Sequence, residues 1–75
     1  MQHFLVTYVD ENNEQIGDPV PMVRASAKEV APEQLDIIIR GVPVLVNARQ
    51  EIIRGTSGNP PVTKVVVHCA RPAAI

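Results

Sequence analysis

The chain has 75 residues, a mass of 8.2 kDa and a formal net charge of −1, which suits one small domain. Hydrophobic residues make up 45% and charged residues 20%, so the chain is too apolar to be intrinsically disordered. No stretch approaches the roughly 20 apolar residues of a membrane-spanning helix. Acidic residues follow closely behind the N-terminus, which is unlike a secretory signal peptide.

The residue types indicate a sheet-rich domain without covalent cross-links. The chain has twelve valines and seven isoleucines but three leucines, and side chains branched at Cβ favour strands over helices. Cys69 is the only cysteine, so no internal disulfide can form and we expect a reducing, cytoplasmic location. A chain of this size buries only about 60% of its unfolded surface, and a homodimer would add buried area.

The N-terminal segments predict a hairpin. Residues 3–10 (HFLVTYVD) are apolar on both faces, which is typical of an interior strand, and the turn at 11–14 (ENNE) suits a tight reversal. The returning strand, about residues 15–24, contains Pro19 and Pro21. Neither proline can donate a ladder hydrogen bond, so this strand is expected at a sheet edge or broken by a bulge.

Residues 26–41 (SAKEVAPEQLDIIIRG) predict a helix. Ser26 and Glu29 have the spacing of a capping box, apolar residues recur at helical spacing, and Gly41 suits the end of a helix. Pro32 opposes a regular helix, because it lacks a backbone donor and clashes with the preceding turn. We therefore expect a kink, or a helix that restarts at Pro32.

The second half of the chain supplies further strands. Residues 42–46 (VPVLV) predict one strand, and residues 62–71 (VTKVVVHCAR) predict the clearest strand of the chain. Residues 47–54 fit either two helical turns or an extension of the preceding strand, and two β-branched isoleucines favour the strand. The whole chain, residues 1–75, is thus predicted to be a single α+β domain in ββαββ order, with the kinked helix packed on one face of a mainly antiparallel sheet.

The residues that invite chemistry do not form a recognisable reaction centre. The loop at 55–61 (GTSGNPP) lacks the spacing of a phosphate-binding loop, because Lys64 comes too late and two prolines remove amide donors, so we interpret it as a connector. His68 and Cys69 are strand neighbours that point to opposite faces, and Cys69 is expected to be a buried small hydrophobe. The acidic segment 10–14 lacks the pattern of a calcium loop. We expect no metal, no cofactor and no enzymatic activity.

Charge is distributed unevenly along the chain. Residues 1–36 carry seven acids and two bases, a net charge of −5, whereas residues 37–75 carry five bases and one acid, a net charge of +4. Such asymmetry would steer the protein to oppositely charged surfaces. The predicted partner-binding residues are the five bases of the second half: Arg40, Arg49, Arg54, Lys64 and Arg71.

By elimination, we expect a small intracellular, non-enzymatic accessory protein that binds a larger protein stoichiometrically, as an inhibitor or adaptor. Its edge strand could add to a partner's sheet or to its own copy as a homodimer. The alternative is a nucleic-acid-binding regulator that uses the basic C-terminal half to contact phosphates. An isoelectric point near 6.0 and only two aromatic residues count against that alternative.

Overall fold

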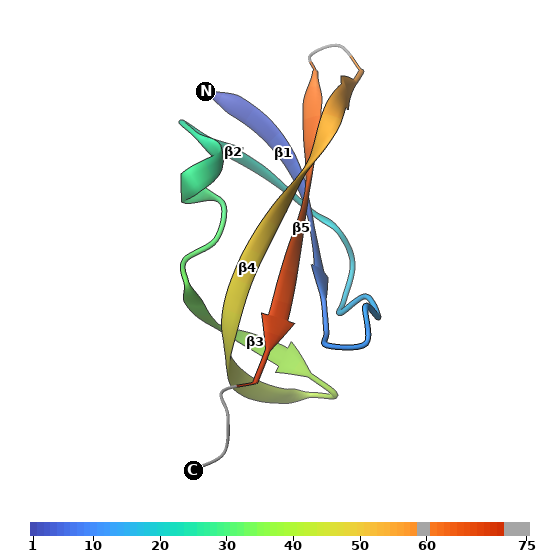
Figure 1. The fold of residues 1–75 in the computed structure, drawn as a ribbon, viewed down its shortest axis with the longest axis vertical. Coiled ribbons are helices and arrows are strands. Elements are labelled where there is room, and N and C mark those ends of the chain that lie inside the picture. Colours follow the sequence, from blue (N-terminus) through green and yellow to red (C-terminus); the bar gives the residue numbers. More distant parts are fainter. Residues whose placement is uncertain (59–60, 72–75) are drawn as a thin grey trace.

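The computed structural model describes residues 1–58 and 61–71, except for the side chains of residues 54–57. These residues form a single curled sheet with one short 3₁₀ helix, η1 (Ala27–Glu29). The five strands are β1 (Gln2–Val9), β2 (Val20–Arg24), β3 (Gln34–Ile39), β4 (Val42–Ser57) and β5 (Val62–Ala70). In Figure 1 the long β4 crosses β5 and turns at its lower end into β3, so that the sheet curls into a half-barrel.

The strand order is β2-β1-β5-β4-β3, so β2 and β3 are the two edges of the sheet. β1 and β5 run parallel, and the other neighbours run antiparallel. Three predictions are confirmed: β1 is an interior strand, the proline-containing β2 is an edge, and residues 47–54 continue the preceding strand as part of β4. β4 pairs first with β3 and then with β5, and this double pairing curls the sheet.

The predicted helix over residues 26–41 is wrong, and with it the α+β class. The helix stops after the three residues of η1, and the chain is extended again from Gln34. Pro32 accounts for the difference, because it cannot donate a helical hydrogen bond and it disfavours the helical conformation of Ala31 before it. Beyond this proline, the consecutive isoleucines of β3 favour the extended backbone.

The capping signals in this segment stabilise one turn only. The carboxylate of Glu29 accepts a hydrogen bond from the backbone N–H of Ala25 (3.1 Å), whereas the side chain of Ser26 caps no backbone group. Gly41, which had suited the end of a helix, instead forms a two-residue hairpin turn with Arg40, and both residues have positive φ (79° and 52°). Three strands, not two, therefore follow the short helix.

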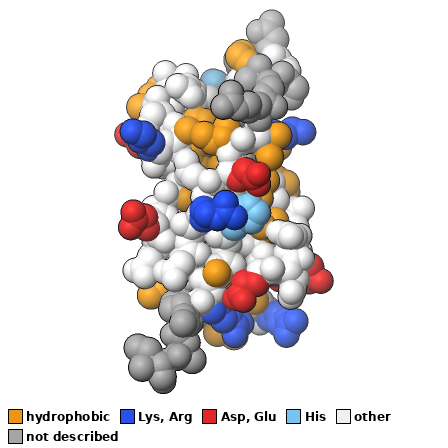
Figure 2. All heavy atoms as spheres, in the orientation of Figure 1, with side chains coloured by type: hydrophobic (Ala, Val, Ile, Leu, Met, Phe, Trp, Pro, Cys, Tyr) orange, Lys and Arg blue, Asp and Glu red, His pale blue; other side chains and the backbone are white. Residues whose placement is uncertain are grey.

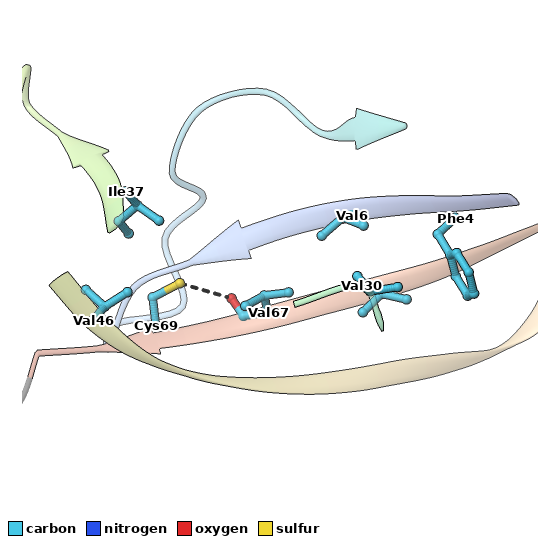
Figure 3. Close-up of a cluster of buried hydrophobic side chains, with 8 residues drawn as sticks. Phe4, Val6, Val30, Ile37, Val46, Val67 and Cys69 are labelled. Carbon is cyan, nitrogen blue, oxygen red and sulfur yellow. Dashed lines mark hydrogen bonds between the residues drawn. The ribbon is translucent and has the colours of Figure 1, made fainter. Parts of the chain in front are cut away.

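The core lies on the concave face of the sheet. Figure 3 shows buried side chains that converge from β1, β3, β4 and β5, while Val30, directly after η1, covers them from the open side. Cys69 is 4% exposed, and its thiol lies 3.7 Å from the carbonyl oxygen of Val67, which confirms that it is a buried small hydrophobe. The cluster consists of Phe4, Val6, Val30, Ile37, Val46, Val65, Val67 and Cys69.

The loop interpreted as a connector lies partly outside the described residues, as do residues 72–75. Its described backbone continues β4 as far as Ser57, and β5 begins at Val62 as the antiparallel neighbour of β4. Within the described part of the chain, no helix is long and apolar enough to cross a membrane.

Candidate functional site

The outer edge of β3 presents unpaired backbone groups. The N–H of Ala48 donates to the carbonyl of Glu33 (2.8 Å). This bond shows which residues of β3 turn their backbone groups toward β4 and which turn them away. In an antiparallel ladder every second residue turns its N–H and C=O toward the neighbouring strand, and the residues between turn theirs away. The backbone groups that point away from β4 are therefore those of Gln34, Asp36 and Ile38.

The outer edge of β2 has fewer such donors. The N–H of Ile16 donates to the carbonyl of Tyr8 (2.7 Å), so the even-numbered residues of β1 bond toward the β2 side. Pro21 pairs with the odd-numbered Leu5, and its nitrogen therefore points outward, away from the ladder. Pro19, just before the strand, also lacks an N–H. The prolines thus leave this edge with fewer N–H donors, and within β2 the N–H of Val23 is the one that still points outward.

An open groove of about 390 Å³ runs beside the free edge of β3. One wall is formed by β3 and the other by the segment that leads into β2, with Tyr8 of β1 between them. Burial, and to a lesser extent the nearby Cys69, raises the pKa of the Tyr8 phenol, so its hydroxyl keeps its proton at neutral pH. The residues that line the groove are Tyr8, Ile16, Gly17, Asp18, Val20, Leu35, Asp36, Ile37 and Ile38.

Apolar side chains remain exposed around this groove. Ile38 is 60% exposed and Leu45 49%, and the two lie diagonally on the same face of the β3–β4 hairpin. Val42, beside the turn, is 57% exposed on the other face of the hairpin, and Val20 on the opposite wall of the groove is 39% exposed. Single exposed apolar residues are ordinary, but Ile38 and Val20 line the groove from its two walls and give it apolar contact area.

The groove is acidic. Asp18 stands on the wall that leads into β2 and Asp36 on β3, and both residues are exposed. No basic side chain is among the described residues that line the groove. An occupant with a positive charge is therefore favoured over an anionic one.

Two of the five predicted partner-binding residues lie in a different hollow. Arg40 and Arg71 line a wide depression of about 620 Å³, together with the acidic turn that follows β1 and the edge of Cys69. Burial raises the pKa of the Cys69 thiol, so it is a poor nucleophile at neutral pH. The fold thus brings these two arginines next to acidic residues, namely Asp10, Glu11 and Glu14.

Two carboxylates of that turn, those of Asp10 and Glu11, accept backbone hydrogen bonds. The side chain of Asp10 accepts hydrogen bonds from the N–H groups of Asn12 (2.8 Å) and Glu14 (3.0 Å). The carboxylate of Glu11 accepts one from the N–H of Arg71 (3.1 Å). These contacts organise the hairpin, and in the described part of the chain no three His, Cys, Asp or Glu side chains are placed to hold a metal ion.

The other predicted basic residues lie elsewhere. Arg49 of β4 is directly opposite His68 of β5, whose Nε2 lies 3.1 Å from a carboxylate oxygen of Glu51. Lys64 is four residues away from His68 along β5, roughly 13 Å. The side chain of Arg54 lies outside the described residues. Basic, acidic and histidine side chains are interspersed on the face seen in Figure 2.

Sequence reasoning missed the groove because it placed Asp36 inside a helix. The available signal was the alternation of Leu35, Ile37 and Ile39 around it, which is the pattern of a half-buried strand. Comparisons of the chain with protein-family models, curated proteins and solved structures found no match. The function therefore has to be argued from the geometry of the edge and the groove.

Proposed function

We propose that this protein is a small cytoplasmic accessory protein that binds a larger protein stoichiometrically, as an inhibitor or adaptor without enzymatic activity, through the free edge of β3. The observation that carries the proposal is the difference between the two edges of the sheet. Pro21 removes one of the two outward donors of β2, whereas Gln34, Asp36 and Ile38 leave a row of donors and acceptors open. An open strand edge is a template for a strand from another chain.

The surroundings of the edge support protein binding over nucleic-acid binding. Ile38 supplies exposed apolar contact area at the edge, and Leu45 extends it on the same face of the β3–β4 hairpin, as apolar residues do in the centre of a protein interface. Asp18 and Asp36 would repel phosphate groups from the same groove. Of the predicted basic contacts, Arg40 and Arg71 lie beside acidic residues, which weakens the field available to a nucleic acid. The buried, reduced Cys69 is compatible with a cytoplasmic location.

The test uses proline as a selective block of each edge. Ile38→Pro removes an outward N–H of β3 and no hydrogen bond to β4, and Val23→Pro is the matched change on β2. Wild type and both variants are used to capture partners from a lysate of the native cell, with and without nuclease, after circular dichroism has shown that each variant is folded.

We expect wild type and Val23→Pro to retain one protein near a one-to-one ratio after nuclease treatment, and Ile38→Pro to retain at least about tenfold less, since the strand pairing is lost. Equal capture by Ile38→Pro would contradict the proposal. Loss of the captured material on nuclease treatment would support the nucleic-acid alternative instead.

A further inference from the structure

The walls of the groove also define the strand that fits it. Resting on the proposed function, we propose that the occupant is an extended segment of a partner protein that carries a basic residue between apolar residues. This segment would pair with the free edge of β3 and fill the groove between β3 and the segment 16–20. The partner strand would then be the sixth strand of the curled sheet.

The two faces of β3 set the side-chain pattern of that segment. Ile37 points into the core toward Val46 and Cys69, as Figure 3 shows, and is only 9% exposed. Asp36 and Ile38 point to the other face of the sheet, where both are exposed. Cross-strand neighbours share a face, so each partner residue meets the environment of the β3 residue opposite it.

The partner residues opposite Ile37 and Leu35 would extend the apolar lining of the concave face, where Leu35 and Tyr8 are only partly buried. The residue opposite Asp36 would face a carboxylate, and the residue opposite Ile38 an exposed apolar side chain. The four partner residues opposite Leu35, Asp36, Ile37 and Ile38 are therefore favoured to be apolar, basic, apolar and apolar, in that order.

Asp36 selects the basic residue, and Asp18 adds to the negative charge of the groove. Asp36 would be the direct cross-strand neighbour of that residue, and Asp18 lines the opposite wall of the same groove. Neither carboxylate makes an ion pair with another described residue. Asp36 is therefore available to a lysine or arginine placed opposite it in the incoming strand, and opposite charges across a strand pair are stabilising.

The same carboxylates argue against a second copy of this chain as the occupant. Two copies of β3 paired antiparallel and centred on Asp36 would place the two Asp36 side chains directly opposite each other, and the register centred on Ile37 would leave both carboxylates in the same pair of strands. Like charges in that position are destabilising, and each copy would add its own Asp18 to the same region. Charge complementarity thus favours a different, basic segment.

The probe is a pair of capped synthetic peptides, Ser-Ile-Val-Lys-Val-Ile-Ser and its counterpart with glutamate in place of lysine. Because the sequence is symmetric, it fits either strand direction. Binding is followed by the amide chemical shifts of the ¹⁵N-labelled protein, for wild type, for Asp18→Lys/Asp36→Lys and for the uncharged Asp18→Asn/Asp36→Asn.

We expect the lysine peptide to shift the amides of Gln34, Asp36, Ile38 and Gly17 in the wild type. Its affinity should fall about tenfold in the double lysine variant, with an intermediate loss in the asparagine variant, since attraction to the carboxylate of Asp36 and to the acidic groove is replaced by repulsion. The glutamate peptide should show the reverse order. Wild-type protein that binds both peptides equally, or shifts confined to β2, would overturn the inference.

Sedimentation velocity of the protein alone tests whether a second copy of this chain occupies the groove. A dimer that forms with rising concentration and disappears in Ile38→Pro would identify a second copy as the occupant and overturn this inference.

The proposed function and the inference about its ligand would fail in different experiments. Capture from lysate that depends on Ile38, without any charge preference among the peptides, leaves the proposed function intact and removes only the basic segment. Capture that ignores Ile38→Pro removes the proposed function itself.

Discussion

β2 and β3 close the two sides of one sheet, yet they expose their backbones in opposite ways. β2 has Pro21 on the outward side of the strand and Pro19 just before the strand, and its outer edge therefore offers few donors. β3 contains no proline and carries the most exposed isoleucine of the described chain, Ile38. The two edges of the sheet thus differ in how many backbone donors they leave open, and the more open edge lies beside an acidic groove.

The two edges should differ most in how strongly they are anchored to the core. Ile37→Ala on β3 should lower the free energy of unfolding by about 2–4 kcal/mol, because it empties a buried site between β3 and β4. Val23→Ala on β2 truncates a side chain that is 43% exposed, and it should change the free energy of unfolding by no more than about 0.5 kcal/mol. Chemical denaturation measures both. Equal effects would mean that β3 is no better anchored than β2.

The turn that presents β3 should have the next largest effect. Gly41 has φ of 79°, so Gly41→Ala should lower the free energy of unfolding by roughly 1–2 kcal/mol, although its new Cβ meets no neighbour within 4 Å. Arg40→Asn should act in the opposite direction by a few tenths of a kcal/mol, because asparagine tolerates positive φ better than arginine. Thermal unfolding of both variants checks the pair, and a neutral Gly41→Ala would contradict the assignment of the turn.

A substitution of Pro21 on β2 should have the smallest effect on stability but a clear effect on self-association. Pro21→Val restores an outward donor on β2 and should change the free energy of unfolding by no more than about 0.5 kcal/mol. It should nevertheless increase self-association, because both edges of the sheet are then open. Sedimentation velocity at several concentrations compares it with wild type. An unchanged profile would show that Pro21 does not protect this edge.

Much of the sheet could be predicted from local patterns, and the helix could not. β1 and β5 are long apolar runs, and β2 is marked by its prolines, so their types follow from neighbouring residues. Residues 26–41 fit two periods at once, since Leu35 and Ile38 recur at helical spacing while Leu35, Ile37 and Ile39 alternate. Pro32 decided between the two patterns: we expected a kink or a helix that restarts at Pro32, but the helical conformation ends before this proline.

The groove could not be predicted because it depends on the order of the strands. Asp18 and Asp36 lie 18 residues apart, and they flank one groove because β3 is the far edge of a curled sheet. Counting charges along the chain also ignored this folding. The count grouped Arg40 and Arg71 with Lys64, whereas the fold places the two arginines beside the acidic turn.

The parallel pair at the heart of the sheet has a consequence for how the chain folds. β1 pairs with β5 from His3 opposite Val62 to Val9 opposite His68, so its partner lies about sixty residues away. Contacts between such distant segments form slowly, since a long loop must close before they contribute any stability. During synthesis the N-terminal hairpin therefore has no complete sheet to join until residues 62–70 have left the ribosome, and its apolar face stays open to chaperones until then.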